Sequence, residues 1–176
     1  MMASPATSRV RSLVAVDEGV LPYAQDAVRR VLLDVQRYHE WWPKPFAFEA
    51  DDGPARAGTR LRATQRPLFH WVVTVTAIEP ERIDMTYGEG SWEGDARWTL
   101  RPVLEGTALV HRIALDPRPL WLKLLAGRVD LARRHSRHMR AVFAALDKRL
   151  ASLGEPRVPE PVPQRPSARP SAPHPA

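Results

Sequence analysis

The chain has 176 residues, of which 44% are hydrophobic, and it carries 26 basic and 20 acidic side chains but no cysteine. This length fits one domain with a terminal extension and excludes a large multidomain enzyme. The lack of cysteine excludes a disulfide framework, a thiol nucleophile and a cysteine-ligated metal. No stretch reaches the roughly 20 apolar residues of a membrane span, and the N-terminus lacks the apolar run of a secretory signal. We therefore expect a cytoplasmic protein.

The net charge of +6 comes from 23 arginines and only 3 lysines, many of them between positions 118 and 149. A basic helix can attract nucleic acid or anionic lipid. The arginines of this segment lack interleaved aromatic residues and match no nucleic-acid module, so we expect no nucleic-acid partner. A solvated helix face is the favoured interpretation, and transient contact with a membrane surface is the alternative, for Arg133, Arg134, Arg137 and Arg140.

The composition changes near the C-terminus. Residues 155–176 contain 8 of the 18 prolines and almost no large apolar side chain. Such a segment cannot bury enough surface to offset its ordering entropy. We predict a flexible N-terminus over 1–8, a folded domain over 9–153 and a disordered proline-rich tail over 154–176.

The first half of the domain reads as a strand, a helix and then a series of strands. Alternation predicts a strand that places Val10, Val14 and Val16 on one face. Pro22 opens a helix at a favoured first-turn position, and Pro43 ends it. Turn residues then separate short strands with hairpin-length links, which favour an antiparallel meander, over 46–50, 59–64, 69–78, 82–87, 92–100 and 107–115.

One long helical pattern follows, from a predicted N-cap at Asp116 to about Leu153. A helix of this length would extend about 50 Å, longer than a small domain is wide, so we expect a bend at Gly127. Its apolar stripe is the only large cover available for the sheet. The predicted fold is α+β, of the helix-grip type, with a curved antiparallel sheet of six to seven strands wrapped around the long C-terminal helix. The space between sheet and helix is the expected site.

The order of these elements, together with four sequence phrases, resembles the START-like (SRPBCC, helix-grip) superfamily, and in particular its polyketide cyclase/dehydrase branch. The phrases occupy residues 31–43, 77–82, 90–94 and 98–107. The resemblance implies a cavity that binds a small hydrophobic ligand such as a lipid, a polyketide or an aromatic isoprenoid. Some members catalyse cyclisation or dehydration there, but the resemblance supplies no catalytic motif that transfers residue by residue.

Strand alternation selects the side chains expected to face inward. They include Trp71, Val73, Val75 and Ala77 on 69–78, Trp92, Trp98 and Leu100 on 92–100, and Leu109, His111, Ile113 and Leu115 on 107–115. Three polar groups share the inward direction, namely Tyr87, His111 and, from the helix stripe, His135. An imidazole can move a proton near neutral pH, so His111 or His135 is the candidate catalytic base, with Tyr87 as a donor. The alternative is that each simply lines the core with a satisfied hydrogen bond.

The predicted ligand-binding set joins these polar groups to apolar side chains around them. Trp42 is expected at the cavity mouth, and Trp121 and Leu125 are expected beside the entrance. Ordinary core packing is the alternative for all three. The full set is Trp42, Trp71, Tyr87, Trp98, His111, Trp121, Leu125, His135 and Met139.

We expect neither a metal nor a cofactor. His135 and His138 are three residues apart and share a helix face, yet no HExxH motif is present, and Asp130 is the only carboxylate nearby on that helix. Three functions stay open: a non-catalytic carrier of lipids or isoprenoids, a cyclase or dehydratase, and an interaction module that uses the arginine face. Polar groups lining a closed cavity favour the enzyme, an apolar tunnel favours the carrier, and a collapsed cavity would favour the module.

Overall fold

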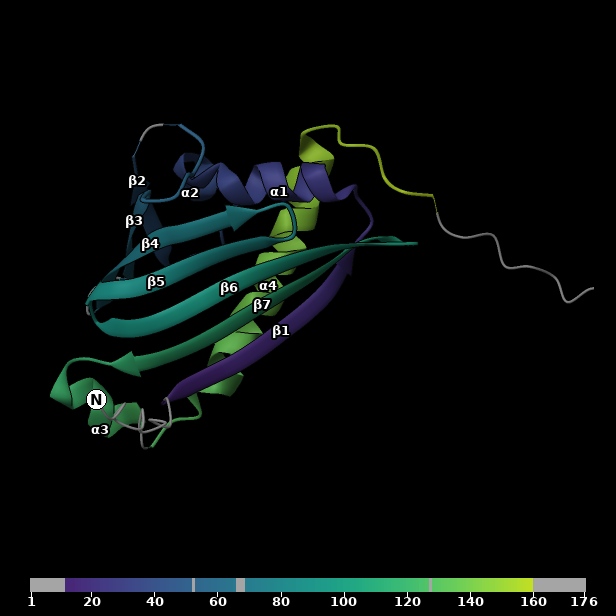
Figure 1. The fold of residues 1–176 in the computed structure, drawn as a ribbon. Helices are drawn as coiled ribbons and strands as arrows, with labels where there is room; N and C mark the ends of the chain where they lie inside the picture. Colours follow the sequence, from purple (N-terminus) through teal and green to yellow (C-terminus); the bar gives the residue numbers. More distant parts are fainter. Residues whose placement is uncertain (1–11, 52, 66–68, 127, 160–176) are drawn as a thin grey trace, which may run out of the picture.

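The computed structural model describes residues 12–51, 53–65, 69–126 and 128–159. Seven strands form one antiparallel sheet in the order β1-β7-β6-β5-β4-β3-β2, and the longest helix, α4, lies across its concave face (Figure 1). This confirms the predicted α+β helix-grip architecture. The elements are β1 (Leu13–Leu21), α1 (Gln25–Leu33), the 3-10 turn η1 (Val35–Arg37), α2 (Tyr38–Trp41), β2 (Phe46–Ala50), β3 (Arg60–Gln65), β4 (Phe69–Glu79), β5 (Arg82–Gly90), β6 (Trp92–Val103), β7 (Gly106–Pro117), α3 (Leu120–Ala126) and α4 (Leu131–Ser152).

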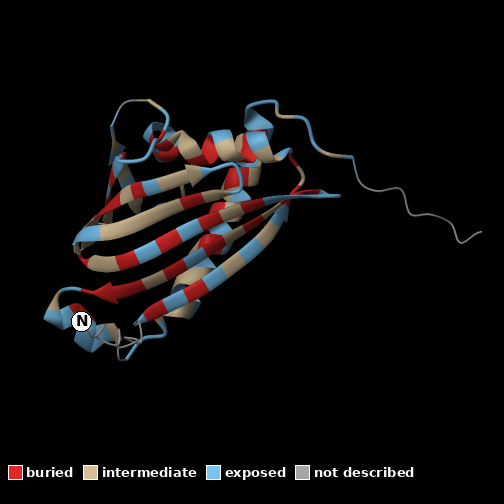
Figure 2. Cartoon of the chain, in the orientation of Figure 1, coloured by how far each residue is buried: buried red, intermediate tan, exposed pale blue. Residues whose placement is uncertain are grey.

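Buried and exposed residues alternate along the sheet, as the bands in Figure 2 show most clearly on β1 and β6. Six of the seven predicted inner residues of β6 and β7 are buried, and Trp92 is half-buried; the six are Trp98, Leu100, Leu109, His111, Ile113 and Leu115. On β1, however, the valines face outward: Val14 and Val16 are exposed, whereas Leu13 and Ala15 are buried. Val10 lies outside the described residues. The residues of β1 that face inward are therefore those that alternate with the valines, beginning with Leu13 and Ala15.

The pairing of β4 with β5 contains two register shifts: at the first, Gly88 is an extra residue on β5, and at the second, Thr76 is an extra residue on β4, between Val75 and Ala77. A bulge adds one residue to a strand, so it reverses which side chains face inward and bends the sheet. The prediction that Ala77 faces inward is wrong for this reason. Beyond the second shift, Ile78 pairs with Ile83 and packs against the core.

The helix expected between Pro22 and Pro43 is divided into α1, η1 and α2. Asp34 ends α1, and its backbone N–H donates to the carbonyl of Arg30. Val28, Val31 and Leu32 are buried at helical spacing, which explains why the pattern reads as a helix.

The single long C-terminal helix is also a wrong prediction, because the segment forms two helices. β7 continues through Pro117, so Asp116 lies in a strand and caps no helix. The cap of α4 is Asp130, whose side chain accepts a hydrogen bond from the backbone N–H of Arg133. The break lies between Ala126 and Leu131, around the expected position, although Gly127 itself lies outside the described residues.

The chain continues in contact with the domain beyond the predicted boundary at residue 153. The Val158 N–H donates to the carbonyl of Pro22, the Arg157 guanidinium contacts the Asp147 carboxylate at 2.6 Å, and Glu155 pairs with Arg30 at 2.6 Å. The predicted flexible segment 1–8 and the tail from residue 160 onward lie outside the described residues. None of the described helices has the length and apolar character needed to cross a membrane.

Candidate ligand-binding cavity

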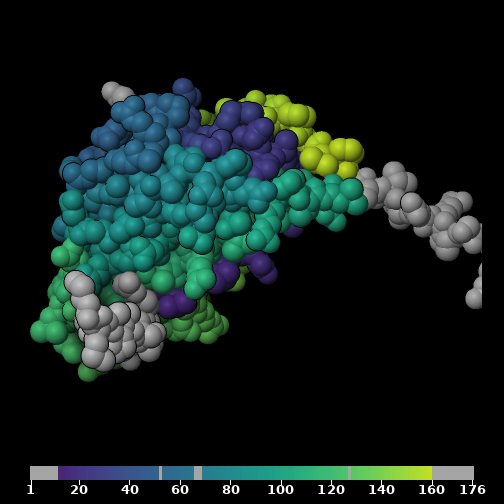
Figure 3. Space-filling view, in the orientation of Figure 1, coloured from purple at the N-terminus to yellow at the C-terminus, as the bar shows by residue number. Residues whose placement is uncertain are grey.

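A cavity of about 480 Å³ lies between the concave face of the sheet and the N-terminal half of α4. Its walls come mainly from strands β3 to β7, from the segment around α2 and β2, and from α4. Figure 3 shows the outer face of the sheet, on the side away from α4. Three exposed residues, Pro45, Arg134 and Arg137, are part of the lining, which places the opening between the start of β2 and α4.

Aromatic side chains form the wall near this opening. Trp42 stacks on Tyr38 with ring centroids 5.1 Å apart, and Phe48 meets both rings edge-on at 5.2 and 5.6 Å. Next to Phe48 on β2, Phe46 packs edge-on against Trp71 at 5.6 Å. Offset and edge-to-face contacts of this kind are the favoured arrangements of aromatic pairs. The wall is therefore rigid and presents ring faces and edges to a ligand.

His138 belongs to this aromatic wall. The Trp42 indole N–H donates to Nε2 of His138 over 3.2 Å, and the ring of Phe46 lies 4.5 Å from the imidazole. Burial, with a smaller contribution from His135, lowers the pKa of His138 to about 4. The neutral imidazole accepts the Trp42 hydrogen bond, and protonation of Nε2 would abolish it.

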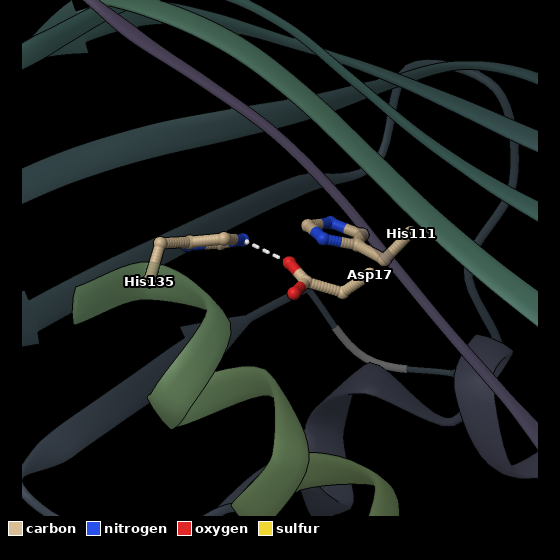
Figure 4. A group of neighbouring side chains, drawn as sticks. All are labelled: Asp17, His111 and His135. Carbon is tan, nitrogen blue, oxygen red and sulfur yellow. Dashed lines mark ion pairs between the residues drawn. The ribbon is translucent and has the colours of Figure 1, made fainter. Parts of the chain in front are cut away.

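A polar cluster of Asp17, His111 and His135 lies at the inner end of the cavity, where the three side chains point toward one another (Figure 4). The sheet register explains two of these positions. Asp17 on β1 lies directly opposite His111 on β7, and His111 lies directly opposite Trp98 on β6. Residues directly opposite on one sheet face have neighbouring side chains. His135 reaches the same point from the first turns of α4.

α4 can approach β1 closely because Gly19 has no side chain. A Cβ at Gly19 would lie 3.3 Å from the ring of Phe143, so a larger residue there would require that ring to shift. Gly19 follows Asp17 by two residues and faces the same side of the strand. The glycine thereby helps to hold His135 near Asp17.

Burial dominates the electrostatics of the polar cluster. The side chain of Asp17 is 9% exposed and that of His135 is 15% exposed, and Nε2 of His135 lies 3.5 Å from Oδ2 of Asp17, close enough for an ion pair but outside hydrogen-bonding geometry. Burial, together with the neighbouring His135, lowers the pKa of His111 to about 3. Burial also lowers the pKa of His135, and the Asp17 carboxylate opposes that shift.

Seven of the nine predicted ligand-binding residues line the cavity: Trp42, Trp71, Tyr87, Trp98, His111, His135 and Met139. Burial raises the pKa of Tyr87, which keeps the phenol protonated as a donor. The other two residues are not part of the lining. Trp121 is 45% exposed and Leu125 is 41% exposed, because both belong to the separate helix α3. Trp121 still contacts Phe69, a lining residue, with ring centroids 5.5 Å apart.

Sequence reasoning missed Asp17. The predicted strand is defined by Val10, Val14 and Val16, which form the more apolar face of this segment in the sequence. The alternate set, Leu13, Ala15 and Asp17, is the buried face. Helix periodicity can bring together only residues near each other in sequence, whereas Asp17 lies far from both histidines along the chain. The alternation of Leu13 and Ala15 with exposed valines was the signal that could have identified it.

The family described as "Polyketide cyclase / dehydrase and lipid transport" matches residues 16–151, and the chain belongs to this family. The match spans β1 to α4, the elements that enclose the cavity. No curated protein matches significantly.

Solved structures share the fold at low sequence identity. The protein TTHA0849 from Thermus thermophilus is 18% identical, with a TM-score of 0.65 over 81% of this chain and 99% of its own. The KanY protein is 16% identical, with a TM-score of 0.62 over 79% and 97%. DynU16, a protein of the dynemicin biosynthetic locus, is 19% identical, with a TM-score of 0.56 over 81% of this chain and 48% of its own. Family and fold point to hydrophobic-ligand binding.

Proposed function

We propose that the protein binds a small, largely aromatic molecule of polyketide type in this cavity and catalyses its cyclisation or dehydration. The observation that carries the proposal is an apolar cavity of about 480 Å³ whose buried inner end carries polar side chains. A ligand site needs apolar area for affinity and a few polar groups for orientation. Both are present in this cavity.

The shape of the walls favours a ligand with fused or stacked rings. Trp42, Phe46 and Trp71 near the opening offer aromatic surfaces, and Trp98 lies farther in, with its ring 4.3 Å from that of His111. Ring contacts between ligand and wall add to the stabilisation from apolar burial. A purely aliphatic chain would gain only the burial.

The inner polar cluster favours a ligand that carries an oxygen atom at its deep end. His111 and His135 line the cavity, and Tyr87 lies on the strand next to β6. A carbonyl or hydroxyl group of the ligand would find hydrogen-bonding groups there. Holding that oxygen while the walls exclude water is what cyclisation or dehydration of a keto compound requires.

The proposal is tested by filling the cavity. Val73 is buried in the cavity wall, so Val73→Phe should reduce the affinity for a naphthol at least tenfold, measured by quenching of tryptophan fluorescence. The matched control is Val16→Phe, because Val16 is exposed on the outward face of β1 and the same substitution there should leave affinity unchanged. Equal affinity in all three proteins would contradict binding in this cavity.

Catalysis is tested separately from binding. Protein isolated from its producing cells is extracted, and the bound compound is identified by mass spectrometry and returned to protein that lacks it. A product that differs by loss of water or by a new ring, formed by the wild type and not by His111→Ala, supports the enzyme. Unchanged turnover by His111→Ala would remove His111 from the catalytic residues.

One observation favours a carrier as the second candidate function. Helix α3 exposes Leu120, Trp121, Leu124 and Leu125 beside the cavity, and Trp121 contacts Phe69 in its wall. An exposed apolar patch next to a ligand cavity suits exchange with a membrane surface. Faster naphthol uptake from vesicles of anionic lipid by the wild type than by Leu124→Glu, with no chemical change in the ligand, would support this function. The presence of an open cavity gives no support to the interaction-module alternative.

A further inference from the structure

We infer that Asp17, His111 and His135 form a binding site for one divalent transition-metal ion at the inner end of the cavity. Two imidazole nitrogens and one carboxylate oxygen meet there, from β7, α4 and β1 (Figure 4). This donor set suits zinc or iron(II), whereas magnesium and calcium prefer sites made of oxygen ligands. The inference stands on the geometry of these three side chains and goes beyond the proposed ligand binding.

The spacing of the donor atoms is close to that of a metal site. The three atoms lie within 4.8 Å of one another, and the pair His135 Nε2 and Asp17 Oδ2 is 3.5 Å apart. Two ligands of a tetrahedral zinc ion, each about 2.1 Å from the metal, lie about 3.4 Å apart. One pair already has this separation, and the third donor lies within 4.8 Å of both.

The same donor atoms are buried and have no hydrogen-bond partner. Among the described residues, five buried side-chain nitrogen or oxygen atoms are unpartnered, and three of them are Asp17 Oδ2, His111 Nδ1 and His135 Nε2. Buried polar atoms without partners are rare in folded proteins because each loses its hydration. Their convergence on one point is explained by a cation that accepts lone pairs from all three.

The fold holds these donors in place without the ion. Asp17 and His111 are directly opposite in the β1–β7 register, so the sheet fixes two ligands. His135 is held by the packing of α4 on β1 next to Gly19. His138, the other histidine of this helix that lines the cavity, is turned toward Trp42 and is not part of the set.

The position of the site gives the ion access to the bound molecule. His111 and His135 both line the cavity, whereas Asp17 lies behind them and is not part of the lining. Three protein ligands leave at least one coordination position open. A bound ion would therefore face the cavity and polarise an oxygen atom at the deep end of the ligand.

The test uses full-length protein that has been treated with a chelator and then titrated with Zn²⁺ alone and, separately, with Co²⁺ alone. We expect one equivalent of Zn²⁺ to bind with a Kd in the micromolar range or below, and Co²⁺ to give the visible absorption of a four- or five-coordinate site. Asp17→Asn preserves the size of the side chain and should weaken Zn²⁺ binding at least tenfold. His135→Gln should do the same, and His138→Gln, the matched control on the same helix, should stay within twofold of the wild type.

The folding of each variant is checked by circular dichroism and by its Tm in the presence of chelator. Metal-free Asp17→Asn should be at least as stable as the metal-free wild type, because it removes a buried charge, and only the wild type and His138→Gln should gain Tm on addition of Zn²⁺. If Asp17→Asn fails to fold, His135→Gln decides the question. Absence of Zn²⁺ binding by a wild type that still binds the naphthol would overturn the metal site and leave the proposed ligand binding intact. Equal Zn²⁺ affinity in all variants would overturn it as well.

Discussion

The two halves of α4 cover the same sheet in different ways. From Val142 onward the helix packs solidly, with fully buried side chains on both sides of the interface, Val142, Leu146 and Leu150 against Val28, Leu100 and Leu109. One turn earlier, at Met139, the helix lines the cavity. Trp98 and Phe143 meet edge-on at 6.1 Å near this boundary.

The difference shows that an amphipathic stripe predicts which face of a helix lies against the sheet, but not whether side chains fill the space between them. The stripe of α4 continues without a change of period from Leu131 to Leu150. The surroundings of the stripe change instead, because His135 and Met139 line the cavity, whereas Leu146 and Leu150 belong to the packed core. Large aromatic rings then hold the walls apart at one end, whereas aliphatic side chains interdigitate at the other.

The largest expected effect comes from truncating a side chain in the packed half. Leu146→Ala should lower the free energy of unfolding by about 3 kcal/mol, because it removes buried methyl groups and leaves a new hole. Met139→Ala should cost less than half of this, since its side chain already borders open space. The measurement is urea denaturation of both variants, and similar losses would show that the two halves are equally well packed.

A smaller loss of stability is expected at acidic pH. It should arise in the half of α4 that lines the cavity, since the packed segment 142–152 contains no histidine. The pKa of His138 is about 4 in the folded protein against about 6.5 when it is exposed, so the folded state binds fewer protons between these values. Stability should therefore be constant above pH 6.5 and should fall as the pH drops toward 4.

Substitution of His138 tests this prediction. His138→Phe should reduce the slope of the Tm against pH over that window, and the buried His111 and His135, whose pKa values are also lowered, account for the remaining slope. His39→Gln is the control, because His39 is exposed and should leave the profile unchanged. A His138→Phe profile identical to that of the wild type would contradict the prediction.

The smallest effect is expected at the far end of the packed half, where residues 155–158 contact the domain. A chain that ends at residue 159 should keep the wild-type Tm, since composition predicts no folded structure beyond it. A chain that ends at Gly154 should melt slightly lower, because it loses the pairing of Arg157 with Asp147 and the hydrogen bond from Val158 to Pro22. Identical melting of the two truncated chains would show that these contacts do not stabilise the domain.

Much of the sheet could be predicted because local patterns determine it. The strand at 46–50 has the predicted bounds, and the hairpin strands that follow differ by a few residues, since turn residues and alternation are both local signals. His111 and Trp98 were correctly placed inside for the same reason. Ala77 was misplaced because a bulge leaves no clear mark in the sequence.

The polar cluster could be predicted only in part because it joins three distant segments. The inward direction of the two histidines could be predicted from the periodicity of their strand and helix. The pairing of Asp17 with His111 could not, because it requires the first strand to pair with the last one. Trp121 and Leu125 were misassigned because helical periodicity continues through the segment 118–131, where the chain actually turns. Hydrophobic periodicity predicts which face of a helix or strand is buried, but it does not predict the angle between two consecutive elements.

The position of β1 at the edge of the sheet has a further consequence. This strand is hydrogen-bonded only to β7, and it supplies Asp17 to a cluster whose other members lie on β7 and α4. Edge elements open with lower free energy than central ones, so amide hydrogen exchange should be faster in β1 than in β6. Transient detachment of this one strand would dismantle the inner end of the cavity while its aromatic wall stayed folded. A ligand bound at the inner end of the cavity would slow amide hydrogen exchange in β1. The exchange rate of this edge strand would therefore indicate whether the cavity is occupied.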